Sequence, residues 1–273
     1  MELDSPAVRD AVQSLAHHAL PAFGLGLAAV VAMACLLGAL LRRHGRRPEG
    51  SRFTPLAWFA GWLALGFAVV VGAALVFAEI AENLADGRQL GALDLLFSDT
   101  LRATVPLAAL RVFAVLTHLG DTATLTGLGI VGAGVLLRRG QRGLCAGWAL
   151  ALAGNAVLNR TLKGIFERTR PVHEHGLAFA DGWSFPSGHS SGSLVAYGML
   201  AYLLLRLLPA RHAAAHLPIV ALAAALAFTA GCSRVFLQVH FASDVLAGFA
   251  SGAAWLTVCI GALELARWRR RAP

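Results

Sequence analysis

Three short polar motifs interrupt an otherwise apolar sequence, and each lies at the end of an apolar segment. They are Lys163 to Arg170-Pro171, then Pro186-Ser187-Gly188-His189, then Ser233-Arg234 with His240 and Asp244 following. The first supplies cations, the second a backbone turn with a histidine, and the third a cation, a histidine and a carboxylate. Because apolar segments deliver all three motifs, we expect them to meet at one membrane surface and to face an anionic group.

The cations are of the types that hold phosphate oxygens. Lys163 is the only lysine in the chain, whereas arginine is used everywhere else. A compact ammonium suits a single phosphate oxygen, while the planar forks of Arg170 and Arg234 can each hold two oxygens. We therefore assign Lys163, Arg170 and Arg234 to substrate binding.

The second motif is predicted to begin a helix, with Ser187 at the N-cap position. Gly188 allows the backbone to approach an anion closely, and the first turn offers free N–H groups at the positive end of the helix dipole. Ser187 and Gly188 are therefore expected to bind a phosphoryl group without a metal ion. A plain capped helix start is the alternative for this motif taken alone.

His240 and Asp244 are four residues apart, so on a helical turn the carboxylate can accept the Nδ1–H of the imidazole. That hydrogen bond leaves Nε2 free to attack phosphorus. No acid lies at a comparable spacing from His189, so we assign it the other role, protonation of the leaving oxygen.

The three motifs, in this order and spacing, resemble the signature of the type 2 phosphatidic acid phosphatase (PAP2) family. The resemblance covers about the last two thirds of the chain. It implies a membrane lipid phosphatase in which the later histidine forms a phosphohistidine and the earlier one is the acid. The Lys, Arg, Ser and Gly residues would hold the phosphoryl oxygens, and neither a metal ion nor another cofactor is implied.

Composition predicts an all-α, polytopic membrane protein. Hydrophobic residues make up 57% and charged residues 14% of the 273 residues, and the mean hydropathy is +0.65. The net charge of +8 could suggest a nucleic-acid partner, but most arginines lie at the ends of apolar runs, as expected from membrane orientation. The four cysteines lie in or beside apolar segments without paired spacing, which indicates neither disulfides nor a zinc site.

Seven spans are predicted, at residues 20–41, 56–77, 121–137, 144–158, 190–208, 217–231 and 244–265. The charge pattern places fourteen arginines and two acids inside, with nine cations and thirteen acids outside. The C-terminus is then cytoplasmic, and all three motifs lie at the outer face, in a bacterial inner membrane.

Two domains are expected: residues 1–55, with a short amphipathic helix, one extra span and a basic cytoplasmic loop, and residues 56–273, a six-span PAP2-like core. Residues 79–120 are mixed in character. We expect one or two interfacial helices there, with a re-entrant piece at 105–119 as the alternative.

Other polar residues receive plainer interpretations. Arg160 and Arg168 are expected to extend to lipid headgroups. The run His173-Glu174-His175 matches no known metal-ligand spacing, so no metal site is assigned. Trp183 and Phe185 either line a lipid entrance or belong to the aromatic belt at the membrane interface.

The predicted function is hydrolysis of a lipid phosphate monoester or pyrophosphate at the outer leaflet. The resemblance implies phosphatidic acid, phosphatidylglycerol phosphate, undecaprenyl pyrophosphate or lipid A phosphate as substrate, and the sequence does not choose among them or indicate an oligomeric state. Two alternatives stay open: a non-catalytic protein that binds anionic lipids, and an intramembrane serine protease using Ser187, Ser190 or Ser191. The protease alternative lacks a nucleophile-elbow pattern and leaves the cations unexplained.

Overall fold

Long apolar runs fold as helices because only a helix satisfies the backbone hydrogen bonds of a single segment within lipid. The computed structural model describes residues 5–44, 53–85, 89–172 and 176–270, and these contain helices and no strand. The α-helices are α1 (Pro6–His17), α2 (Ala19–His44), α3 (Pro55–Ala85), α4 (Gln89–Thr104), α5 (Leu107–Leu116), α6 (Thr122–Arg138), α7 (Arg142–Phe166), α8 (Gly188–Leu207), α9 (His216–Phe236) and α10 (Ala242–Arg269). Two 3-10 helices, η1 (Thr117–Gly120) and η2 (Ala210–Ala215), precede α6 and α9.

Each of the seven predicted spans coincides with a long helix, namely α2, α3 and α6 to α10. By length and hydropathy, six helical segments of the described chain qualify as membrane spans. α7 is not among them, because Asn155, Asn159 and Arg160 lower the hydropathy of its second half. It nevertheless packs against α6, α8 and α10 and is 25 residues long, enough to cross a bilayer.

Residues 79–120 differ in part from the prediction. α3 continues to Ala85 and so includes Glu79 and Glu82, which had been placed beyond the span. Two helices follow, α4 and α5, and α5 runs through η1 into α6 as one 32-residue apolar segment, Leu107–Arg138.

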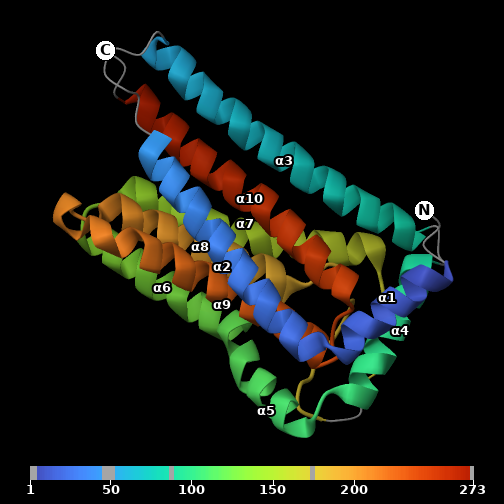
Figure 1. Ribbon diagram of the computed structural model, residues 1–273. Helices are drawn as coiled ribbons and strands as arrows, with labels where there is room; N and C mark the ends of the chain where they lie inside the picture. The colour runs from blue at the N-terminus through green and yellow to red at the C-terminus, as the bar shows by residue number, and fades with distance from the viewer. Residues whose placement is uncertain (1–4, 45–52, 86–88, 173–175, 271–273) are drawn as a thin grey trace.

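α8 is the central helix of the bundle and packs against α6, α7, α9 and α10. Small residues allow the close approach of these helices. Gly252 of α10 lies against the backbone of Ser191, and Gly198 of α8 lies against Leu256. The more peripheral helices α2 and α3 pack on α9 and α10, respectively (Figure 1).

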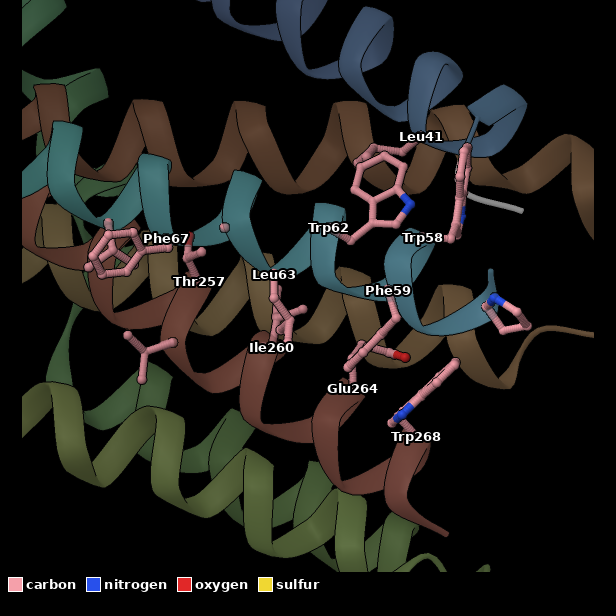
Figure 2. Close-up of a pocket in the computed structure, with 15 residues that line it drawn as sticks. Leu41, Trp58, Phe59, Trp62, Leu63, Phe67, Thr257, Ile260, Glu264 and Trp268 are labelled. Atoms are coloured by element: carbon pink, nitrogen blue, oxygen red, sulfur yellow. The ribbon is translucent and has the colours of Figure 1, made fainter. Parts of the chain in front are cut away.

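The two ends of the bundle differ. α1, α4 and α5 gather at one end, where α8 and α10 begin, and α10 ends at the other (Figure 1). Near the C-terminal end, a cavity of about 930 Å³ lies between α3 and α10. Trp58, Trp62 and Phe67 of α3 and Trp268 of α10 are among the side chains around it (Figure 2). None of the motif residues lines this cavity, so the candidate site must be sought at the α1/α4 end.

Candidate active site

The turn between α9 and α10 carries a buried histidine and carboxylate. Asp244, in the first turn of α10, accepts hydrogen bonds from the backbone N–H of Phe241 (3.0 Å) and from Nδ1 of His240 (3.2 Å). The first bond caps the helix and the second orients the imidazole, as the four-residue spacing predicts. Nε2 of His240 is left as the unprotonated nitrogen.

Arg170 fixes the other side of the same ring. Its Nη1 donates to Nε2 of His240 at 3.1 Å. The guanidinium also donates to four backbone carbonyls, those of Val239 (2.7 Å), Gly182 (2.9 Å), Asp181 (3.0 Å) and Trp183 (3.1 Å). This cation therefore cannot turn away from the imidazole without breaking several hydrogen bonds.

The environment of His240 keeps its imidazole neutral. Burial lowers the pKa of His240 to about 3, although the hydrogen bond and charge of Asp244 act in the opposite direction. The charges of Arg170 and Lys163 also disfavour a proton on this ring. At neutral pH, Nε2 is therefore unprotonated and, among the described residues, its electron pair accepts only the hydrogen bond from Arg170, which suits a nucleophile for phosphorus.

The other two predicted cations lie in the same cluster. Nζ of Lys163 donates to the carbonyls of Trp183 and Ser184. Nη1 of Arg234 donates to Oγ1 of Thr117 at 2.9 Å, while its buried Nε has no partner among the described residues. Three cations, one of which has a buried N–H group without a hydrogen-bond partner among the described residues, suit a multiply charged anion better than an uncharged ligand.

The helix start at residues 186–189 is joined directly to the His/Asp turn. Ser187 is the N-cap of α8, where its Oγ accepts the N–H of Ser190 (3.3 Å) and its own N–H donates to the carbonyl of Asp244 (2.9 Å). A Cβ at Gly188 would lie 3.0 Å from Oδ1 of Asn159, so a larger residue would crowd α7. The positive end of α8 thus faces the cluster that contains His240.

Comparison with known proteins shows the family to which the chain belongs. A family model of the PAP2 superfamily matches residues 143–268. Phosphatidylglycerophosphatase B of Bacillus subtilis (strain 168) is 38% identical over 150 residues, which cover 52% of this chain and 69% of that protein. The chain belongs to the PAP2 superfamily.

The structure of this PAP2 protein also resembles a solved one. The crystal structure described as the first transmembrane PAP2 type phosphatidylglycerolphosphate phosphatase from Bacillus subtilis matches with a TM-score of 0.64 and 30% identity. The match covers 72% of this chain and 96% of that one. The predicted family and the all-helical membrane fold are therefore confirmed, and the protein is an integral-membrane lipid phosphatase.

Arg168 is placed differently from the sequence-based expectation. Instead of extending to headgroups, Nη1 donates to Oδ1 of Asp244 (2.7 Å) and Oγ of Ser243 (2.7 Å), and Nη2 donates to Oδ2 of Asp94 (2.8 Å). Its guanidinium also lies 4.2 Å from the ring centre of Phe241. Two buried carboxylates offer stronger charge-assisted hydrogen bonds than solvent does, so the headgroup prediction was wrong for Arg168.

Asp94 of α4 was missed entirely by the sequence analysis. It accepts hydrogen bonds from the N–H and Oγ of Ser243, as well as from Arg168. Burial raises the pKa of Asp94, and the bonds from Ser243 and Arg168 counteract this effect. A carboxylate among Leu93, Leu95 and Leu96 was the available signal, but it was read as part of an interfacial helix.

His189 has an acidic partner that local spacing could not reveal. Nε2 of His189 lies 3.0 Å from Oδ1 of Asp121, which precedes α6. The sequence offers no acid at a helical spacing from His189, and this partner lies 68 residues earlier in the chain. Asp94 and Asp121 both precede the segment matched by the family model.

The remaining predictions concern aromatic and metal-binding residues. Phe185 is buried and packs against Phe77 (5.4 Å) and Phe166 (5.0 Å between ring centres), so it neither lines an entrance nor belongs to a surface belt. Trp183 is partly exposed. The run at 173–175 lies outside the described residues, and the described part of the chain contains no group of three or more potential metal ligands.

Proposed function

We propose that the protein hydrolyses the terminal phosphate monoester of phosphatidylglycerophosphate, with His240 as nucleophile. The observation that carries this proposal is the buried His240, held at Nδ1 by Asp244 and met at Nε2 by Arg170. The choice of lipid rests on the two relatives, both named as phosphatases of this lipid.

In the proposed first step, Nε2 of His240 forms a bond to phosphorus while the bond from phosphorus to the glycerol oxygen breaks. Lys163, Arg170 and Arg234 stabilise the charge of the transferring group, together with the N-terminus of α8. His189 gives its proton to the leaving oxygen. Water then attacks the phosphohistidine, returns a proton to His189 and releases inorganic phosphate.

We place this chemistry at the outer face of the membrane. The C-terminal end of the bundle carries arginines of α6, α10 and the α6–α7 turn, as expected of a cytoplasmic surface. The cations of the cluster lie at the opposite end, where the charge pattern is otherwise acidic. An anionic substrate explains why they are retained there.

The test is hydrolysis by purified protein of a panel containing phosphatidylglycerophosphate, phosphatidic acid, undecaprenyl pyrophosphate and lipid A phosphate. We expect the first to give the highest kcat/KM. Preference for a pyrophosphate would reject the assigned substrate while leaving the phosphatase chemistry intact.

The nucleophile is tested with His240→Gln, which keeps a hydrogen-bonding group of similar size. Hydrolysis should fall by on the order of 10³-fold or more, and radioactive phosphate should no longer be transferred from substrate to acid-quenched protein. Labelling that persists in this variant would assign the nucleophile to another residue.

Chelators should leave the wild-type rate unchanged, since the proposed steps use no metal ion.

A serine nucleophile receives no support from the geometry. Among the described residues, neither His189 nor His240 is hydrogen-bonded to a serine hydroxyl. Oγ of Ser187 instead accepts the N–H of Ser190. The protease alternative therefore lacks an activated hydroxyl.

A further inference from the structure

Gly120 and Asp121, which lie between α5 and α6, contact the ring of His189. A Cβ at Gly120 would lie 2.8 Å from Cδ2 of His189, so glycine is needed for this approach. Oδ1 of Asp121 lies 3.0 Å from Nε2 of the same ring. The second oxygen, Oδ2, lies 2.5 Å from Nδ1 of His118, whose side chain is 70% exposed.

The contact is held in place by helices that carry two of the motifs. The hydroxyl of Tyr197 in α8 donates to the carbonyl of Leu119 at 2.7 Å. Arg234 in α9 donates to Oγ1 of Thr117 at 2.9 Å. Residues 117–121 are therefore anchored from both sides, and Asp121 meets His189 as part of an ordered segment.

We infer that Asp121 is a positioning residue that holds His189 by Nε2–H, so that Nδ1–H is directed to the leaving oxygen. The inference rests on the proposed function, in which His189 is the general acid. When the phosphorus–oxygen bond breaks, the leaving oxygen takes the Nδ1 proton. Water later returns a proton to Nδ1 as its oxygen bonds to phosphorus, and Asp121 remains ionised throughout.

Charged groups from several elements act on His189. The charged groups that act on the ring are Arg234 of α9, Arg170 of the loop before α8 and Asp121 at the start of α6. His118 of η1 shares the carboxylate of Asp121. Without Asp121, His189 would face two cations with no opposing carboxylate of the described chain in hydrogen-bonding contact.

The test is Asp121→Asn, assayed with two substrates that differ in their leaving groups. The side chain of Asp121 makes no capping hydrogen bond in α6, so asparagine should preserve the start of this helix. With phosphatidylglycerophosphate, whose alkoxide needs a proton, kcat should fall on the order of 10²-fold. With p-nitrophenyl phosphate, whose nitrophenolate leaves without one, the rate should change less than about threefold.

A pH profile provides a second measurement. In the variant, the alkaline limb of kcat for the lipid substrate should move to lower pH, because the imidazolium has lost its anionic partner. Asp99→Asn is the matched control, since Asp99 is an exposed acid of α4 whose ion-pair partner is Arg102. It should leave both rates and the profile unchanged.

The measurements distinguish failure of the role proposed for Asp121 from failure of the proposed phosphatase function. Equal losses on both substrates, or an unshifted alkaline limb, would overturn the role of Asp121 while leaving the phosphatase assignment standing. A wild-type protein that hydrolyses neither substrate would reject the proposed function, and the role of Asp121 would fall with it.

Discussion

Arg168 joins two carboxylates that lie 150 positions apart in the sequence, and its charge is shared between them. Asp94 and Asp244 are both buried, and each accepts a hydrogen bond from this guanidinium below 3 Å. The bridge immobilises Asp244 from the side opposite His240. A buried ion pair of this kind is costly to break, because the remaining charge stays desolvated.

Replacing Arg168 with methionine should therefore destabilise the protein by about 3–5 kcal/mol and reduce hydrolysis. Thermal unfolding in detergent and the initial rate with the lipid substrate measure the two effects. Arg160→Met is the matched control, because Arg160 is an exposed residue of α7. It should change the free energy of unfolding by less than about 0.5 kcal/mol. Equal effects of the two substitutions would show that the bridge contributes nothing specific.

The lowered pKa of His240 gives a pH dependence of stability. The unfolded chain binds a proton near pH 6.5, whereas the folded protein binds it only near pH 3. The contribution of His240 to the free energy of unfolding is therefore fully present above about pH 6.5. It falls by up to ~1.4 kcal/mol per pH unit as the pH drops toward 3. The raised pKa of Asp94 acts in the opposite direction, because the folded protein binds a proton at this carboxylate more readily than the unfolded chain does.

Thermal unfolding between pH 7.5 and 5.5 should accordingly show a falling midpoint for the wild type. The slope should be shallower for His240→Gln, which has no imidazole to protonate. Parallel slopes for the two proteins would mean that His240 can be protonated without a cost to folding.

Residue spacing predicted the local pairs but not the distant ones. His240 and Asp244 are close in sequence, so helical geometry alone brings them together. Asp94 and Asp121 reach the cluster only through the packing of α4 and η1. No local pattern encodes such contacts, which is why Arg168 was misplaced and the acidic partner of His189 was not predicted.

At the scale of elements, the lengths of the apolar runs were enough to predict where the long helices lie. α8 and α10 begin within two residues of their predicted starts, since a capped polar turn precedes each apolar run. The structure of residues 79–120 was harder to predict, because some of their acidic side chains are exposed whereas Asp94 is buried in a hydrogen-bonded contact. Glu79 and Glu82 continue α3, whereas Asp94 enters the site.

The packing of α10 on α8 provides a test at this scale. A Cβ at Gly248 would lie 2.6 Å from the carbonyl oxygen of Ser187, and this backbone atom cannot rotate away. Gly248→Ala should therefore lower the free energy of unfolding by about 1–3 kcal/mol. It should also lower kcat by about 10-fold or more, because it displaces the helix start that is bonded to Asp244.

Gly261→Ala is the matched control on the same helix. A Cβ at Gly261 would meet nothing within 4 Å, so alanine should be neutral or stabilise the helix by up to ~1 kcal/mol. Unfolding midpoints and kcat of the two variants provide the comparison. A Gly248→Ala protein with wild-type activity would show that the α8–α10 contact tolerates separation.

At the scale of the whole molecule, the two ends of the bundle have different chemistry. The cations of the site and the buried acids occupy the end where α8 and α10 begin, and the aromatic cavity between α3 and α10 occupies the other. If the seven long helices of the described residues all cross the membrane, the two ends of the spanning region lie on opposite faces. Orientation then determines which leaflet supplies the substrate.

Single cysteines can measure this orientation in intact cells. Phe179 in the loop before α8 is 82% exposed, and Arg139 in the α6–α7 turn is also exposed. The native cysteines give a low background, because Cys259 is buried and the other three are only partly accessible. We expect a membrane-impermeant maleimide to label Phe179→Cys from outside, but to label Arg139→Cys only after permeabilisation.

A reporter fused after Pro273 should agree by showing a cytoplasmic C-terminus, because the terminal arginines of α10 favour retention inside. Labelling of Arg139→Cys in intact cells would invert the bundle and move the cation cluster to the inner leaflet. The chemistry proposed for His240 would be unaffected, but the enzyme would then draw its substrate from the cytoplasmic side. External labelling at both positions would instead reject α7 as a span, since the crossings before and after it could no longer alternate.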